Sequence, residues 1–237
     1  MINYTHLKAD CKQVSRDPAL VMFMLLPSFI FIIFRLVVVF LFPYIYELTG
    51  YDILGCGGFV LAFAFLVTPL MIGAATGFLM IDERDNRIFE LMAVTPAGRS
   101  GYIANRLLMP FVMGVLYTIA GYFILCVSGV SLPMLIYIAV LVGFEGIMTG
   151  LLLFGLAEDK VKGLAYSKAM GAFMVFGMAD LLGVKWVSVI SSFFPHYWIS
   201  RLVNNPAGIL PVLLSALVHL MWLCLAVSAY VYGIHRS

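Results

Sequence analysis

Residues 53–81 read ILGCGGFVLAFAFLVTPLMIGAATGFLMI, a stretch of 29 residues that contains no charged side chain. An α-helix needs roughly 20 apolar residues to cross the hydrocarbon core of a bilayer, which is about 30 Å thick. Backbone N–H and C=O groups find no partners in lipid, so a crossing segment must pair them internally as a helix. The stretch therefore predicts a membrane-spanning helix in an all-α integral membrane protein.

The composition of the whole chain points the same way. Hydrophobic residues make up 63% of the 237 residues and charged residues only 11%, whereas a soluble domain is roughly 45–50% apolar and about 25% charged. A chain with so little polar surface needs membrane lipid as its main solvent. The net charge of +2 names no partner, and no basic stripe alternates with aromatic residues, so nothing indicates binding of nucleic acid.

Five more apolar segments are long enough to cross the membrane. We therefore expect six transmembrane helices in a single transmembrane domain, residues 1–237. The Gly- and Pro-containing segment 128–133 predicts a tight hairpin between the third and fourth of them. The expected spans are Leu20–Phe42, one within Ile53–Ile81, Leu107–Val127, Met134–Ala157, Leu164–Val184 and Ile209–Ile234.

One apolar run is too short to cross. Residues 186–200, here called the outer aromatic segment, are 15 in number and include Phe194, Pro195, Tyr197 and Trp198. Aromatic rings of this kind favour the headgroup level of a membrane. We expect an interfacial or re-entrant element before the last span.

The distribution of Lys and Arg predicts the orientation. Eleven of these residues fall on one side of the six expected spans and only two, Lys185 and Arg201, on the other. The positive-inside rule then places both termini in the cytoplasm, which requires an even number of spans. The start of the chain, Met1–Asp17, is polar and mixed in charge, so we expect no cleavable signal peptide.

Two cytoplasmic segments have helical patterns. In Met1–Asp17, the residues Leu7, Cys11 and Val14 recur at i, i+4 and i+7, which predicts a short amphipathic helix on the inner membrane surface. The alternative is a frayed polar tail. The second segment, residues 82–106, is the longest cytoplasmic loop and is called the coupling loop below.

The coupling loop combines a charge pair with an apolar face. Glu83 and Arg87 stand at i, i+4 in the favourable order, and Pro96 ends the helical pattern. We expect a short helix that either folds back on the membrane or forms a docking surface for a partner. Its apolar face consists of Ile88, Leu91 and Met92.

No catalytic, cofactor or metal motif occurs in the chain. It lacks the GxxxxGK[ST] nucleotide loop, HExxH, GxSxG and EF-hand patterns, and its four His residues are widely spread. The four Cys residues have no metal-ligand spacing and favour free thiols, although a disulfide between Cys56 and Cys126 stays open. Energy for any transport must therefore come from another chain or from an ion gradient.

Three ionisable residues lie at membrane depth: Arg35, Glu145 and Asp180. Such residues are costly in lipid and mark either pathways or structural pairs. Arg35 is close enough to the outer end of its span to snorkel outward, which favours a structural role. Glu145 lies near mid-span among small residues that permit close helix contact, so it either faces a translocation route or stabilises the bundle. The small residues are Gly143, Gly146 and Gly150.

Residues 81–96, IDERDNRIFELMAVTP, resemble the cytoplasmic loop of ABC-2-type export permeases, which carry an acidic run, a Glu-Leu pair and Thr-Pro. Tyr102 and Arg106, which lead into a span, also fit. One departure is Arg87-Ile88, where the family often has Gly-Thr. The residues that the resemblance places at the coupling contact are Glu83, Arg87, Ile88, Phe89, Glu90, Leu91, Met92, Thr95 and Pro96.

Two further segments resemble the same family. Residues 158–168, EDKVKGLAYSK, resemble an Asn-Lys-Val-Glu-Gly element, with Asp159 in place of Asn and Lys162 in place of Glu. Residues 194–198, FPHYW, resemble the Phe-Pro-x-x-Trp element before the last span. The resemblance covers most of the chain.

The resemblance implies a function. Two permease subunits, identical or different, would pair in the cell membrane of a prokaryote, each with a separate ABC ATPase subunit. That partner would bind ATP and Mg, while this chain would bind no cofactor. The loop helix around residues 86–101 would sit in a groove of the ATPase, and the complex would export a drug, lipid or peptide.

Two other classes of function remain open from the sequence. One is a non-transporting membrane scaffold or assembly factor. The other is a secondary transporter driven by an ion gradient, a class that often has internal repeats and broken helices. We see no clear repeat between the two halves of the chain. A gene for an ATPase beside the gene for this chain would favour the ATP-driven interpretation.

Overall fold

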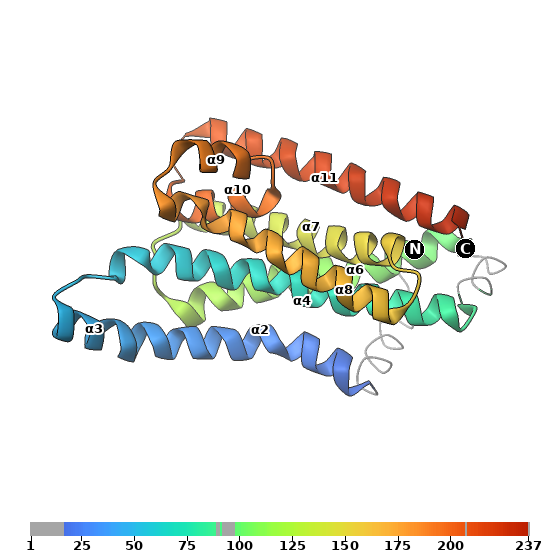
Figure 1. Ribbon diagram of the computed structural model, residues 1–237, viewed down its shortest axis with the longest axis horizontal. Coiled ribbons are helices and arrows are strands. Elements are labelled where there is room, and N and C mark those ends of the chain that lie inside the picture. Colours follow the sequence, from blue (N-terminus) through green and yellow to red (C-terminus); the bar gives the residue numbers. More distant parts are fainter. Residues whose placement is uncertain (1–16, 89–90, 92–97, 207, 237) are drawn as a thin grey trace.

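The computed structural model is all-helical where it describes the chain, at residues 17–88, 91, 98–206 and 208–236 (Figure 1). Five described helical stretches are long and apolar enough to cross a membrane. They correspond to five of the six predicted spans. The expected helix Met1–Asp17 lies outside the described residues except for Asp17 itself.

The five stretches are built from the following elements. The first combines α2 (Pro18–Leu36), the short π-helix η1 (Val37–Leu41) and α3 (Phe42–Thr49), so it continues beyond the predicted end at Phe42. The single turn η2 (Leu54–Cys56) leads into the second. The other four stretches are α4 (Gly57–Asp85), α6 (Gly98–Leu125), α7 (Leu132–Leu156) and α11 (Ile209–Arg236).

The predicted span Leu164–Val184 is wrong as a single α-helix. The structure has α8 (Lys160–Ala172) followed by a 3-10 helix, η3 (Phe173–Leu182). A 3-10 helix is thinner than an α-helix and rises faster per residue. At Gly177 an added Cβ would lie 2.4 Å from Leu66 Cδ1, so the thin η3 packs directly against α4. Together α8 and η3 run the length of the bundle beside α4 (Figure 1).

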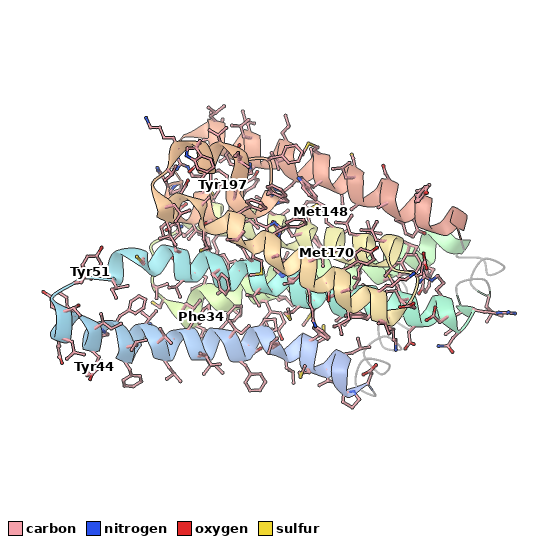
Figure 2. All side chains as sticks on the ribbon, in the orientation of Figure 1. Phe34, Tyr44, Tyr51, Met148, Met170 and Tyr197 are labelled. Atoms are coloured by element: carbon pink, nitrogen blue, oxygen red, sulfur yellow. The ribbon has the colours of Figure 1, made fainter. Side chains whose placement is uncertain are left out.

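The bundle has two distinct ends. At one end, called the basic end, α2 starts, α4, α7 and α11 finish, and α6 and α8 start (Figure 1). At the other, called the aromatic end, lie α3, α9 (Lys185–Ser191) and α10 (Pro195–Asn204). Tyr44 and Tyr51 point outward at the aromatic end, where they are 57% and 72% exposed (Figure 2). Exposed tyrosines near span ends are typical of headgroup contact.

Helix α7 is the centre of the bundle, because it packs against α4, α6 and α11 at once. Close contact depends on glycine at each of these crossings. A Cβ added at Gly146 would lie 3.1 Å from the carbonyl oxygen of Pro110, and one at Gly73 would lie 2.6 Å from that of Gly146. The predicted close packing at Gly143, Gly146 and Gly150 is thus confirmed.

The crossing of α7 with α11 predicts a stability defect. A Cβ at Gly155 would lie 2.6 Å from the backbone oxygen of Ala229, so Gly155→Ala must push α7 and α11 apart. We expect a cost of about 1–3 kcal/mol, as for overpacked cores, seen as a lower melting temperature in detergent. Gly129→Ala is the control, because nothing lies within 4 Å of a Cβ there. Equal melting temperatures for the two variants would contradict this packing.

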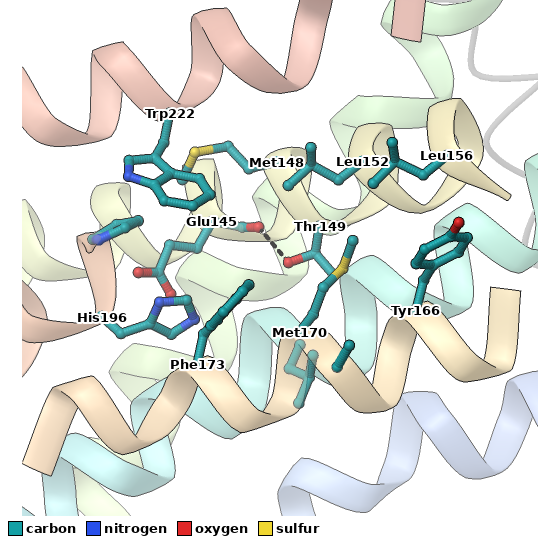
Figure 3. A pocket seen from close by; sticks show the side chains of 13 residues that line it. Glu145, Met148, Thr149, Leu152, Leu156, Tyr166, Met170, Phe173, His196 and Trp222 are labelled. Carbon is teal, nitrogen blue, oxygen red and sulfur yellow. Dashed lines mark hydrogen bonds between the residues drawn. The ribbon is translucent and has the colours of Figure 1, made fainter. Parts of the chain in front are cut away.

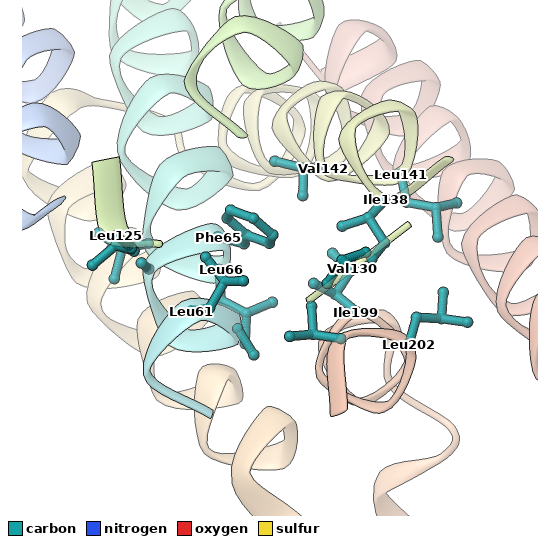
Figure 4. Close-up of a cluster of buried hydrophobic side chains, with 14 of the residues drawn as sticks. Leu61, Phe65, Leu66, Leu125, Val130, Ile138, Leu141, Val142, Ile199 and Leu202 are labelled. Carbon is teal, nitrogen blue, oxygen red and sulfur yellow. The ribbon is translucent and has the colours of Figure 1, made fainter. Parts of the chain in front are cut away.

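The outer aromatic segment forms two short helices with different surroundings. In α9, Trp186 and Val189 are exposed. In α10, Ile199 and Leu202 are completely buried against α4 and α7 in the largest core cluster (Figure 4). Helix α10 is therefore part of the core, and the depth of the outer aromatic segment in the membrane stays a prediction. The buried positions of α10 include Pro195, Tyr197 and Trp198.

Candidate functional site

A half-open cavity of about 280 Å³ lies beside Glu145, between α7, α8 and α11 (Figure 3). It is bounded by α7, by α8 and the start of η3, and by α11, and the first residues of α10 close it. Most of its lining is apolar. We call it the Glu145 cavity; besides Glu145, the residues used below are Leu156, Tyr166, Phe173, His196 and Trp222.

Four polar side-chain atoms around this cavity are buried without hydrogen-bond partners in the described structure. Glu145 and His219 are each 3% exposed, and Nε2 of His219 lies 3.6 Å from a Glu145 carboxylate oxygen, beyond normal hydrogen-bond length. Nδ1 of His219 is 2.8 Å from the carbonyl oxygen of Ser215. Neither oxygen of Glu145 has a hydrogen-bond partner in the described structure, nor do Nε2 of His219 and Nδ1 of His196.

A cluster of stacked rings closes the cavity toward the aromatic end. Phe194 stacks on Phe176 with ring centroids 3.9 Å apart, and its ring is 5.4 Å from that of Phe173 and 5.6 Å from that of Trp222. The indole N–H of Trp222 donates to the carbonyl oxygen of Phe193 at 2.8 Å. These contacts hold η3, α10 and α11 together, and of the residues 194–198 that were singled out in the sequence, Pro195 and His196 line the cavity.

A second cavity, of about 560 Å³, lies at the basic end of the bundle. We call it the vestibule; Arg84, Glu158 and Tyr232 are among its lining residues. Leu156 and Tyr166 line both the vestibule and the Glu145 cavity. The two cavities are therefore neighbours, separated only in the region of these two side chains.

Near the vestibule rim, Lys162 donates a hydrogen bond to Glu158, its neighbour at i−4. That hydrogen bond raises the pKa of Lys162 above its usual value.

Glu83 forms a buried ionic contact that we call the clamp. Its side chain is 3% exposed and accepts hydrogen bonds from Nε and Nη2 of Arg106 and from the hydroxyl group of Tyr102. Glu83 lies near the end of α4 and its two partners lie in the first turns of α6. The clamp thus joins the two helices that the coupling loop connects.

The next residue of α4 links the same region to α7. Arg84 donates hydrogen bonds to the carbonyl oxygens of Ala157 and Glu158, at 2.7 and 2.8 Å, just beyond the end of α7. Its guanidinium also lies 5.1 Å from the ring centroid of Phe154. Cations favour the C-terminal end of a helix because it carries a partial negative charge. Glu83 and Arg84 therefore tie the loop end of α4 to both α6 and α7.

The predicted helical pair of Glu83 with Arg87 is wrong. Helix α4 ends at Asp85, and Arg87 has a left-handed backbone with φ of 57°, so the i, i+4 geometry of a helix is lost there. Beyond this point Ile88 and Leu91 are described, with Leu91 68% exposed. The other predicted contact residues, Phe89, Glu90, Met92, Thr95 and Pro96, lie outside the described residues.

The backbone conformation of Arg87 is one that favours glycine, the residue that the resembled family often has at this position. Position 87 is one where that family often has Gly, and glycine adopts positive φ without steric cost. We expect Arg87→Gly to raise the melting temperature slightly, by up to about 1 kcal/mol in stability. Arg87→Ala is the matched control, since it removes the charge and keeps the strain. Equal effects of the two substitutions would show that the charge, and not the backbone, matters.

The other two intramembrane charges are paired. Nη1 of Arg35 donates to the carbonyl oxygen of Leu125 at the end of α6, at 2.8 Å. Asp180 accepts hydrogen bonds from Arg201 at 2.9 Å and from Ser188 at 2.6 Å, which ties η3 to α9 and α10. The bond to Asp180 raises the pKa of Arg201. Of the three charges, Glu145 alone was found without a hydrogen-bond partner for its side chain in the described structure.

Other site chemistry is not present in the described residues. They contain no group of three or more His, Cys, Asp or Glu residues that could hold a metal ion. Cys56 and Cys126 are both free thiols, so the open question of a disulfide between them is answered by the structure. Sequence reasoning missed that His196 and Trp222 line the same cavity as Glu145, because they come from segments far away in the chain.

Comparison with known proteins identifies the kind of molecule to which these features belong. A family model described as "Fluoroquinolones export permease protein Rv2686c-like" matches residues 10–227, which include the Glu145 cavity and the clamp. The chain belongs to this family. It is therefore a membrane export permease with transmembrane helices, which is the transport part of such a system rather than its ATPase.

Two relatives of this permease come from Mycobacterium tuberculosis. They are Fluoroquinolones export permease protein Rv2686c of strain ATCC 25618 / H37Rv and Fluoroquinolones export permease protein MT2760 of strain CDC 1551 / Oshkosh. Each is 28% identical over 204 residues, which cover 81% of this chain and 77% of the relative. No solved structure matches the chain.

Proposed function

We propose that this permease is the membrane subunit of an ATP-driven exporter that moves amphipathic drugs, of the fluoroquinolone class, out of the cytoplasm. Membership of a fluoroquinolone export family is the observation that carries the proposal. The substrate class comes from the relatives, which are named for fluoroquinolones. A separate ABC ATPase, holding ATP and Mg, supplies the energy, because the sequence contains no nucleotide-binding loop.

The proposal includes a sixth crossing by α8 and η3. Their 13 and 10 residues, at the rises of α- and 3-10 helices, reach on the order of 40 Å, more than the hydrocarbon core requires. The basic end then faces the cytoplasm, in line with the positive-inside rule. The start of α2 and the end of α11 lie on that side, as do the described ends of the coupling loop, where an ATPase can reach them.

The contacts at the basic end suggest how movement reaches the cavity. An ATPase that shifts the coupling loop pulls on the end of α4, which is fixed to α6 by the clamp and to α7 by Arg84. Helix α7 carries Glu145 and also contributes Leu156, which lies between the vestibule and the Glu145 cavity. A rigid displacement of α7 therefore changes both the Glu145 cavity and its boundary with the vestibule. Pairing of two such permeases, identical or different, completes the exporter.

Purification of the permease with a candidate ATPase tests the proposal. We expect a stable complex whose ATP hydrolysis rises when norfloxacin, a fluoroquinolone, is added. The control is an ATPase variant that lacks the lysine of its nucleotide-binding loop. Failure of every ATPase encoded near the permease gene to form a complex would favour a scaffold role instead.

One observation favours a second candidate, an exporter driven by an ion gradient. Glu145 and His219 are both buried, and Nε2 of His219 lies 3.6 Å from a carboxylate oxygen of Glu145; buried pairs of ionisable residues occur in the proton relays of transporters. A proton-driven exporter would keep its activity without an ATPase and lose it when the proton gradient is collapsed. The transport measurement at the end of the Discussion separates the two.

A further inference from the structure

The side chain of Glu145 is a carboxylate that the protein leaves unsatisfied. Burial of a charge without a hydrogen-bond donor or an opposite charge is costly, and in a membrane protein it marks a functional site. The nearest hydroxyl group is not available, because Thr149 donates to the backbone carbonyl oxygen of Glu145 at 2.9 Å. Both carboxylate oxygens are buried and lack partners in the described structure, so the described side chains supply no hydrogen-bond donor to this carboxylate.

The charges around Glu145 favour a positively charged ligand. The described residues that line the cavity include no Lys or Arg, so no permanently charged cation of its wall faces the carboxylate. The titratable neighbours are His196, Tyr166 on α8 and, behind Glu145 on α11, His219; the lining residue from α4 is the apolar Leu70. A positively charged ligand therefore meets no repelling fixed cation on any wall.

Two aromatic rings complete the site. Figure 3 shows the Glu145 side chain directed toward His196, with Trp222 on one side and Phe173 on the other. The indole N–H of Trp222 donates a hydrogen bond to the carbonyl oxygen of Phe193. Trp222 therefore offers the cavity the surface of its ring and no free N–H group. Aromatic faces attract cations, most strongly when water is excluded. A carboxylate beside two such rings is suited to an organic ammonium group.

We propose that the Glu145 cavity is a binding site within each subunit for the cationic amine end of an aromatic amphipathic compound, with Glu145 as the counter-ion. The proposal deepens the proposed function, on which it rests for the direction of transport. The volume of about 280 Å³ is near the lower end of small-ligand sites. The cavity accommodates one substituted ring with its amine. The rest of a larger drug extends toward the vestibule past Leu156 and Tyr166.

A pair of probes that differ only in charge tests the site. Benzyltrimethylammonium is a cation, and neopentylbenzene is its neutral counterpart with carbon in place of nitrogen. Binding to the full chain in phosphatidylcholine nanodiscs is measured by calorimetry, with empty nanodiscs subtracted. We expect the cation to bind at least tenfold more tightly than the neutral probe. Equal affinities for wild-type protein would overturn the proposal without any variant.

Two variants locate the binding. Glu145→Gln should weaken cation binding tenfold or more and leave the neutral probe unchanged, whereas Glu158→Gln, on the vestibule rim, should change neither. Ala169→Phe adds a ring to the cavity wall and keeps Glu145, so it should weaken both probes. A retained preference for the cation in Glu145→Gln, or full binding of both probes to Ala169→Phe, would contradict the site.

The binding assay contains no ATPase. A negative result therefore leaves ATP-driven export standing, and failure of complex formation leaves the binding site standing.

Discussion

Replacing Leu91 with Asp is expected to abolish stable binding of the ATPase while the permease stays folded. The Leu91 side chain is 68% exposed at the basic end and has the size of an interface anchor. A charge placed in an apolar groove is expected to cost on the order of 2 kcal/mol or more, a loss of roughly 30-fold in Kd. Affinity for the ATPase, measured by surface-based binding with purified subunits, checks this result.

Leu48→Asp is the matched control for that experiment. Leu48 is 66% exposed, almost the same as Leu91, but it lies in α3 at the aromatic end. Its substitution should leave ATPase binding unchanged, and the melting temperatures of both variants show whether the bundle is intact. Recovery of a complex of wild-type affinity with Leu91→Asp would remove the coupling loop from the interface.

The second large effect is expected at the clamp. Arg106→Ala leaves the carboxylate of Glu83 buried without its main partner, and such a loss typically costs about 3–5 kcal/mol. The melting temperature should fall strongly. Removing both charges, as in the double variant Glu83→Met and Arg106→Met, should recover much of this stability, because a buried ion pair is often replaceable by apolar side chains.

The double variant also separates stability from coupling. With the ionic contact gone, α4 and α6 are no longer fixed at the ends of the coupling loop, so drug-stimulated ATP hydrolysis should stay low even though the fold recovers. Lys162→Ala breaks an exposed ion pair at the same end and should change neither quantity. Full stimulation of the ATPase by the double variant would show that the clamp is structural only.

Hydropathy alone predicted the spans that are regular helices. Long apolar runs such as Ile53–Ile81 must form helices in lipid, because their backbone groups find no other hydrogen-bond partners there. The small residues around Glu145 predicted the close packing of α7. The same reasoning missed the helix type at Leu164–Val184, because hydropathy does not distinguish a 3-10 helix from an α-helix. The switch to a 3-10 helix accompanies packing of Gly177 against Leu66, a contact between distant parts of the chain.

Only part of the candidate site could be predicted from the sequence. Glu145 could be found because a carboxylate in an apolar run is rare. Its cavity could not, since the rings of Phe173 and Trp222 come from η3 and α11 and meet only in the folded bundle. Glu83 was assigned to the wrong partner because helical spacing was extended past Asp85, where the helix ends and the chain turns at Arg87.

The central claim is that ATP hydrolysis on a partner chain drives export through this permease. Uptake of norfloxacin into inside-out vesicles that contain both subunits tests it directly, with a protonophore present to collapse any proton gradient. The account predicts accumulation that requires ATP, persists with the protonophore and disappears when the nucleotide-binding lysine of the ATPase is replaced. Uptake that stops with the protonophore and is indifferent to the ATPase variant would contradict it.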